Sequence, residues 1–199
     1  MKRFFSDHSY DMVKMFLNQF AIGLFGFTLY LVSGQAKSVA LRNVTSVGAI
    51  LFYLFLLYTM TWEIGYRDKV SVEHGKKKRN LFKGALISLC ANIPNFIFAL
   101  FITLAMFLNA PAISSIGGVC GFLAPVLEGM YTGLLINLVG GAMLNTYWWS
   151  YFLLPLPAIL TCGVAYVMGI KDLKCTSIFD PIVPESDRDP SERNRKFHD

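Results

Sequence analysis

Long apolar segments alternate with short polar stretches along most of the chain. Segments of about 20 apolar residues are long enough to cross roughly 30 Å of hydrocarbon as helices. We predict full membrane spans at residues 12–32, 44–64, 81–108 and 148–170. The pattern therefore predicts an all-α fold, a polytopic bundle of membrane helices.

The two ends of the chain are more polar than this membrane domain, which covers residues 12–174. Residues 1–11 mix basic, acidic and aromatic positions, which predicts a short amphipathic lead-in on the cytoplasmic side. Residues 175–199 carry mixed charges and frequent prolines without an apolar repeat, which predicts a disordered cytoplasmic tail.

The third predicted span contains Asn92, Pro94 and Asn95 near its middle. Proline inside a helix removes one backbone hydrogen bond and usually causes a kink. In a membrane the freed carbonyl needs a partner, and nearby amides can supply one. We predict a kinked helix with self-satisfied polar groups; the alternative is a broken helix that lines a cavity, as in many transporters.

Residues 110–147 form a glycine-rich segment without Lys or Arg, and Glu128 is its one charged residue. Its 38 residues are too few for two complete crossings with a turn, at about 20 residues each. We predict a re-entrant hairpin or a helix on the outer surface. A single crossing, which would give five spans, is the alternative.

Composition supports a membrane protein: 54% of the 199 residues are hydrophobic, 16% are charged, and the mean hydropathy is +0.48. Soluble domains have about a quarter of their residues charged. The net charge of +5 lies largely beside apolar segments, above all in Lys76, Lys77, Lys78 and Arg79. Short basic loops stay cytoplasmic, so we interpret this charge as a determinant of topology and not as a nucleic-acid surface.

The distribution of Lys and Arg favours four spans over five. With four spans both termini are cytoplasmic, and only Lys37 and Arg42 of the 18 basic residues lie outside. With five spans the six basic residues from Lys171 onward also move outside. The positive-inside rule prefers the first arrangement.

The sequence lacks the motifs of the common catalytic and cofactor sites. It contains no phosphate-binding lysine loop, dinucleotide glycine motif, zinc-protease helix or nucleophile elbow. Its three histidines lie outside the predicted spans, and its four cysteines show no metal or disulfide spacing. We therefore predict no cofactor and no metal site, and we favour a role other than catalysis.

Glu128 is the strongest candidate for a functional residue, because ionisable residues at membrane depth are costly and commonly functional. Its carboxylate could bind a cation or carry a proton, with Asn92, Asn95 and Asn137 as neutral ligands. The competing interpretation places the segment outside the hydrocarbon, where Glu128 would face water or headgroups.

Two functions fit this pattern. The first is transport, by a small transporter or a subunit of a transport system, with a site near the kinked span and Glu128. The second is a non-catalytic adaptor that recruits a cytoplasmic partner through its basic loop and tail. Expected partners are anionic lipid headgroups at the residues of the basic loop, and a second copy of the chain or a transport complex; nucleic acid is not expected.

Overall fold

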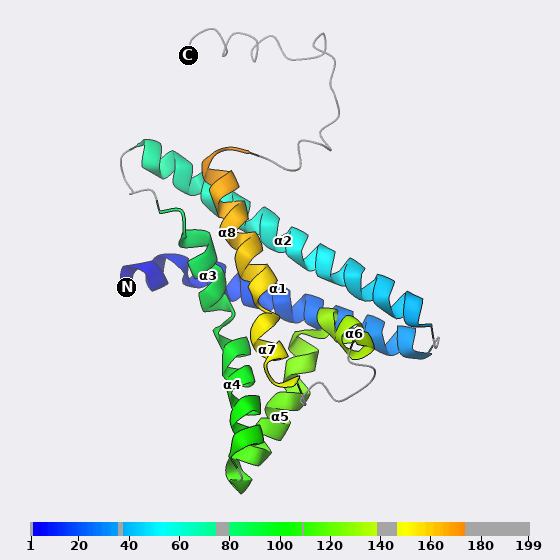
Figure 1. The fold of residues 1–199 in the computed structure, drawn as a ribbon. Coiled ribbons are helices and arrows are strands. Elements are labelled where there is room, and N and C mark those ends of the chain that lie inside the picture. The colour runs from blue at the N-terminus through cyan, green and yellow to red at the C-terminus, as the bar shows by residue number, and fades with distance from the viewer. Residues whose placement is uncertain (1, 36–37, 75–79, 109, 139–146, 174–199) are drawn as a thin grey trace.

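The computed structural model describes residues 2–35, 38–74, 80–108, 110–138 and 147–173. In this part of the chain all the regular secondary-structure elements are helices, which confirms the predicted all-α class. Figure 1 shows two long helices lying together, with the shorter helices packed on one side of them. The elements are, in order, α1 (Lys2–Gln35), α2 (Val39–Glu73), α3 (Lys83–Ala91), α4 (Ile93–Phe107), α5 (Pro111–Leu127), α6 (Gly129–Leu138), α7 (Ser150–Leu153) and α8 (Leu156–Ile170).

The first two helices are longer than the spans that the sequence predicted within them. They contain 34 and 35 residues, which corresponds to about 50 Å each at a rise of about 1.5 Å per residue. Helix α1 continues through the lead-in without a break because no Gly or Pro precedes Gly23. Helix α2 likewise continues past residue 64 into the charged stretch, and its buried stripe ends at Asp68.

The next two helices form one bent unit. Helices α3 and α4 meet at Asn92 with a bend of 52°, as the sequence predicted from Pro94. The Asn92 side chain donates to the Ser88 carbonyl (2.8 Å), and Asn95 Nδ2 donates to Asn92 Oδ1 (2.9 Å). The break therefore contains partners for part of its polar groups, while Asn95 Oδ1 is buried without a partner among the described residues.

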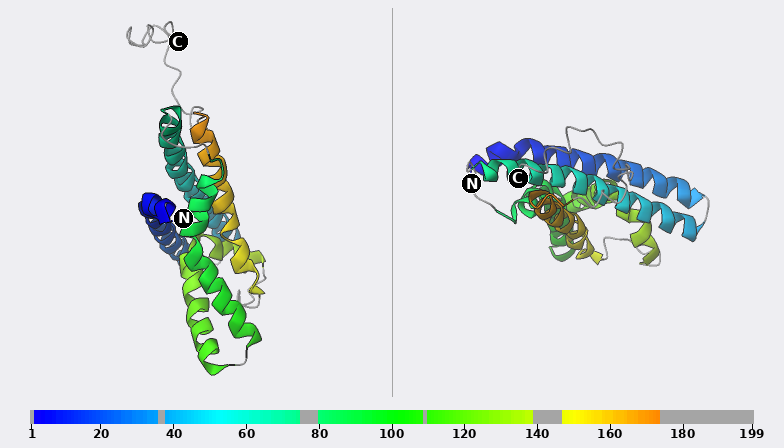
Figure 2. Two further views of the ribbon diagram at one scale, coloured as in Figure 1. Left: turned by 90° about the vertical axis from the view of Figure 1, so that its left-hand side faces the viewer. Right: turned by 90° about the horizontal axis from the view of Figure 1, so that it is seen from above.

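The glycine-rich segment contains a second and sharper break. Helices α5 and α6 meet at Glu128 with a bend of 103°. Helix α5 returns along α4 as an antiparallel hairpin that extends away from α1 and α2, while α6 lies across those two helices (Figures 1 and 2). The segment is therefore a bent pair of helices and not one straight helix.

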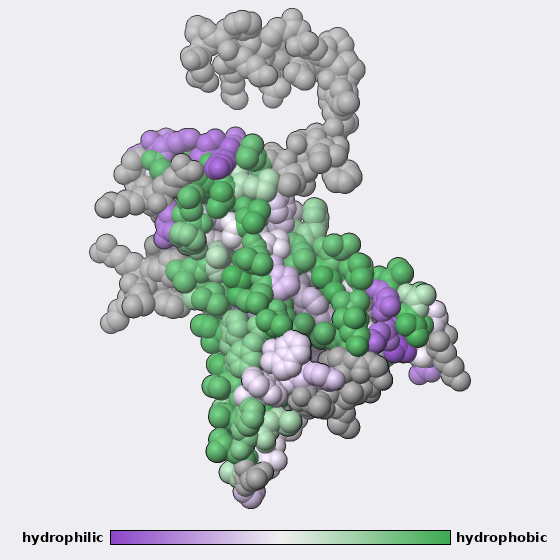
Figure 3. Space-filling view, viewed as in Figure 1, coloured by the Kyte–Doolittle hydropathy of each residue, from purple (hydrophilic) through white to green (hydrophobic). Residues whose placement is uncertain are grey.

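By length and composition, the described residues contain three helices that could each cross a membrane, or up to five candidate spans if each bent pair counts as one. Their outer faces carry large apolar side chains, and Figure 3 shows a continuous hydrophobic surface over α3 and α4. Soluble monomers rarely expose patches above a few hundred Å². These features support the predicted multi-pass membrane protein.

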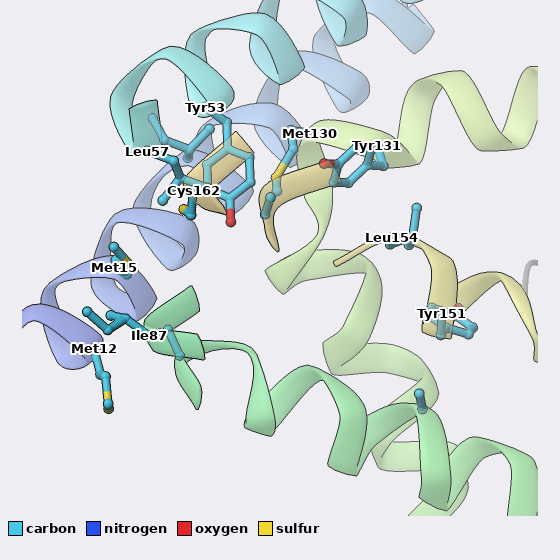
Figure 4. Close-up of a cluster of buried hydrophobic side chains, with 14 of the residues drawn as sticks. Met12, Met15, Tyr53, Leu57, Ile87, Met130, Tyr131, Tyr151, Leu154 and Cys162 are labelled. Carbon is cyan, nitrogen blue, oxygen red and sulfur yellow. The ribbon is translucent and has the colours of Figure 1, made fainter. Parts of the chain in front are cut away.

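The buried core forms where α2, α6 and α8 meet. Tyr53 and Leu57 of α2 pack with Met130 of α6 and Cys162 of α8 (Figure 4). At the far end of the same contact, α2 and α8 come together at Gly65 and Gly169. A Cβ at Gly65 would lie 2.4 Å from the Tyr166 carbonyl oxygen, so only glycine permits this approach.

Candidate functional site

Glu128 lies at the junction of α5 and α6 and is 5% exposed. Its backbone N–H donates to the Ala124 carbonyl, and its own carbonyl accepts from the Tyr131 N–H, each at 2.9 Å. The backbone of Glu128 is therefore hydrogen-bonded to both helices, and its carboxyl group lies at the point where the chain turns.

Helix α1 packs against this junction at glycine residues, which allow close backbone contact. A Cβ at Gly23 would lie 2.2 Å from the Leu127 carbonyl oxygen, and one at Gly129 would lie 2.1 Å from the Gly23 carbonyl oxygen. The two backbones therefore touch directly on either side of Glu128. A side chain at these positions would force α1 away from the break.

Within the described part of the chain, the carboxyl group of Glu128 lacks a counterion. It takes part in no ion pair with the described residues, and its buried Oε2 has no hydrogen-bond partner among them. The carboxyl interacts electrostatically with three phenols, those of Tyr53, Tyr131 and Tyr151. The Tyr131 hydroxyl is also buried without a hydrogen-bond partner in this part of the structure.

This arrangement can hold one positive charge. A buried carboxylate without a partner is costly, so it is neutralised by a proton or by a bound cation. Hydroxyl and amide oxygens are neutral ligands that accept such a cation without adding charge. The described residues contain no group of three or more His, Cys, Asp or Glu that could hold a metal ion, so the donor set here is one carboxylate surrounded by neutral groups.

The two breaks lie at the same end of the α4–α5 hairpin. A Cβ at Gly117 would lie 3.1 Å from the Phe101 carbonyl oxygen and 2.1 Å from Ala105 Cβ, which fixes the register of the two antiparallel helices. Both helices rise about 1.5 Å per residue. Counting from Gly117 toward Glu128 on α5, and back along α4 from the residues opposite Gly117, therefore places the Asn92 break level with Glu128.

The three amides that the sequence proposed as ligands have different positions. Asn92 and Asn95 are buried at the first break, and Asn95 Oδ1 is a buried acceptor without a partner among the described residues. Asn137 lies near the far end of α6, about 13 Å along the helix from Glu128. There it accepts from Arg42 Nη1 (3.1 Å) and donates to Asn43 Oδ1 (2.6 Å). Of the three proposed amides, Asn92 and Asn95 therefore lie level with Glu128 along the hairpin, and Asn137 does not.

A second polar cluster was missed by the sequence analysis. Asp68 is buried between α2, α3 and α8, and its Oδ2 accepts from Lys83 Nζ at 2.5 Å and from the Tyr166 hydroxyl at 2.8 Å. The available signal was spacing, because Asp68 follows Thr61, Ile64 and Gly65 on one helical face.

The remaining candidate residues, Lys76, Lys77, Lys78 and Arg79, lie outside the described residues, as does the tail predicted at residues 175–199. Comparison of the chain with protein-family models, curated proteins and solved structures found no match.

Proposed function

We propose that this protein acts in membrane transport, as a small transporter or a subunit of a transport system, with Glu128 as its ion-binding residue. The observation that carries the proposal is the buried carboxyl at a 103° helix break, with one oxygen that no described residue partners. Breaks in membrane helices that meet near the midplane are a recurring way to build substrate and ion sites.

The ligand that fits this site is a proton or a monovalent cation. One carboxylate offers a single negative charge, and the phenols of Tyr53, Tyr131 and Tyr151 are neutral. A divalent cation would leave a net positive charge in a low-dielectric interior, which is unfavourable.

The depth of Glu128 supports this proposal. Met130, two residues after Glu128, packs with Tyr53, and Tyr53 is about 16 Å along α2 from Arg42 and about 22 Å from Asp68. If α2 crosses the bilayer between these two charged residues, Glu128 lies near the midplane.

We propose four full spans, with the segment of α5 and α6 re-entering from the side of Arg42. The support is that Lys83 pairs with Asp68 at one end of α2, while Asn137 pairs with Arg42 at the other. The positive-inside rule then places the end that holds Asp68, together with both termini, in the cytoplasm.

The test is ion flux into proteoliposomes that contain the purified full-length protein. Proton uptake is followed with an enclosed pH-sensitive dye, and Na⁺ and K⁺ gradients are imposed separately. We expect one of these ions to move with the wild type and Glu128→Gln to abolish that flux. Glu63→Gln is the matched control, since Glu63 is exposed, and it should leave flux unchanged. Equal flux in wild type and Glu128→Gln would overturn the proposal.

A further inference from the structure

Arg42, in the first turn of α2, is held in a fixed position by two other helices. Its Nη1 donates to Asn137 Oδ1 of α6 at 3.1 Å, and its guanidinium carbon lies 5.7 Å from the ring centroid of Tyr30 on α1. Asn137 is fixed in turn by Asn43, whose Oδ1 accepts from Asn137 Nδ2 at 2.6 Å. The guanidinium is thus oriented by neutral groups on each side.

Among the described residues, the charge of Arg42 has no compensating acid at this end of the bundle. The sequence contains no Asp or Glu from residue 12 to residue 62, and between residues 74 and 171 it contains only Glu128. Glu128 is about 13 Å along α6 from Asn137. Arg42 takes part in no ion pair with the described residues, although arginine stays charged at any physiological pH.

Part of the hydrogen-bonding capacity of Arg42 is also unused. Its Nε is buried and has no partner among the described residues. Because Asn137 occupies Nη1, the edge formed by Nε and Nη2 remains for another acceptor. This edge is the one that pairs with both oxygens of a carboxylate or phosphate.

We propose that Arg42, positioned by Asn137, Asn43 and Tyr30, binds an anionic oxyacid group, either a soluble phosphate-type anion or the phosphate of a lipid headgroup. A planar or tetrahedral oxyanion would fill the Nε–Nη2 edge and supply the missing negative charge. This inference concerns the opposite end of α6 from Glu128 and does not rest on the proposed transport function.

The test uses the purified full-length protein in a nonionic detergent and follows its thermal unfolding temperature. A ligand that binds only the folded state raises that temperature. The probes are sodium phosphate, compared with sodium chloride at equal ionic strength, and phosphatidylglycerol, compared with phosphatidylcholine. A rise with phosphate identifies a soluble anion, whereas a rise with phosphatidylglycerol alone identifies a lipid headgroup.

Two variants and one control decide whether Arg42 is responsible. Arg42→Gln should weaken binding of the effective probe by about tenfold or more, the factor expected for a charged hydrogen bond. Asn137→Asp should abolish the response while keeping the fold, because its carboxylate supplies the anion internally. Arg67→Gln removes an exposed arginine at the other end of α2 and should keep the response. The proposal is overturned if neither probe stabilises the wild type, or if Asn137→Asp responds as the wild type does.

Discussion

Lys83 Nζ lies 2.5 Å from Asp68 Oδ2, and this contact joins the start of the bent α3–α4 unit to α2. The hydroxyl of Tyr166 binds the same oxygen at 2.8 Å, so α8 is attached as well. One carboxylate oxygen therefore connects three helices at the end of the bundle that leads into the basic loop. The pair is largely buried, with side-chain exposures of 13% for Lys83 and 8% for Asp68.

Asp68→Asn should lower the free energy of unfolding by about 3 kcal/mol, because it leaves the Lys83 charge buried without its partner. The measurement is unfolding in mixed detergent micelles, followed by tryptophan fluorescence. Asp172→Asn is the control: Asp172 pairs with Lys69 at 3.3 Å but is half exposed. That change should cost less than about 1 kcal/mol, and an equal loss in both variants would contradict the prediction.

Combining Asp68→Asn with Lys83→Met should recover most of the stability lost in Asp68→Asn alone. The double variant removes both charges, and a neutral pair of similar volume is often as stable as a buried ion pair. A double-mutant cycle in the same micelles gives the coupling energy between the two positions. Simple additivity of the two single effects would show that the contact is not energetically coupled.

Gly23→Ala should destabilise the protein by about 1–3 kcal/mol, because the added methyl group would overlap the Leu127 carbonyl oxygen. The comparison is Gly48→Ala, since a Cβ at Gly48 meets nothing within 4 Å. Alanine is a better helix former than glycine, so that control should be neutral or stabilising by up to about 1 kcal/mol. The measurement is the thermal unfolding temperature of the two variants under the same conditions. Equal unfolding temperatures would contradict the close contact between Gly23 and Leu127.

The proposed re-entrant arrangement predicts different accessibility at the two ends of α6. In a background without Cys90, Cys120, Cys162 and Cys175, we place single cysteines at Leu138 and at Glu128. A membrane-impermeant maleimide added to intact cells should label position 138, which is 73% exposed, and should not label position 128. Protection of both positions would fit a single crossing, and labelling of both would place the segment at the outer surface.

The parts of the fold that depend on local chemistry were predictable from the sequence. The kink follows from Pro94, whose missing N–H acts within one turn. The prominence of Glu128 follows from its being the one charge in a long apolar segment. A break of the chain at Glu128 was also predictable, because Pro125 precedes this residue and Gly129 follows it. The size of the bend, 103°, was not predictable from these residues.

Contacts between distant residues were not predictable in this way. Asp68 falls between the predicted spans 44–64 and 81–108, and its partners Lys83 and Tyr166 come 15 and 98 positions later. Asn137 was assigned to the Glu128 site because it shares the same segment, yet it bonds Arg42 from 95 positions away. The spacing of Asp68 from Thr61, Ile64 and Gly65 indicates its burial but not its partners, and the residues near Asn137 do not indicate its contact with Arg42.

The contact of α2 with α8 has a consequence for how the protein is made. Helix α2 ends at Glu73 and α8 ends at Ile170, so the ribosome adds about 100 residues between them. At roughly 5–20 residues per second, α2 is complete about 5–20 s before its partner α8. During that interval the Gly65 face of α2 lacks the helix against which it packs in the finished structure. Among the described helices, α8 is therefore synthesised last, and it completes the packing of α2.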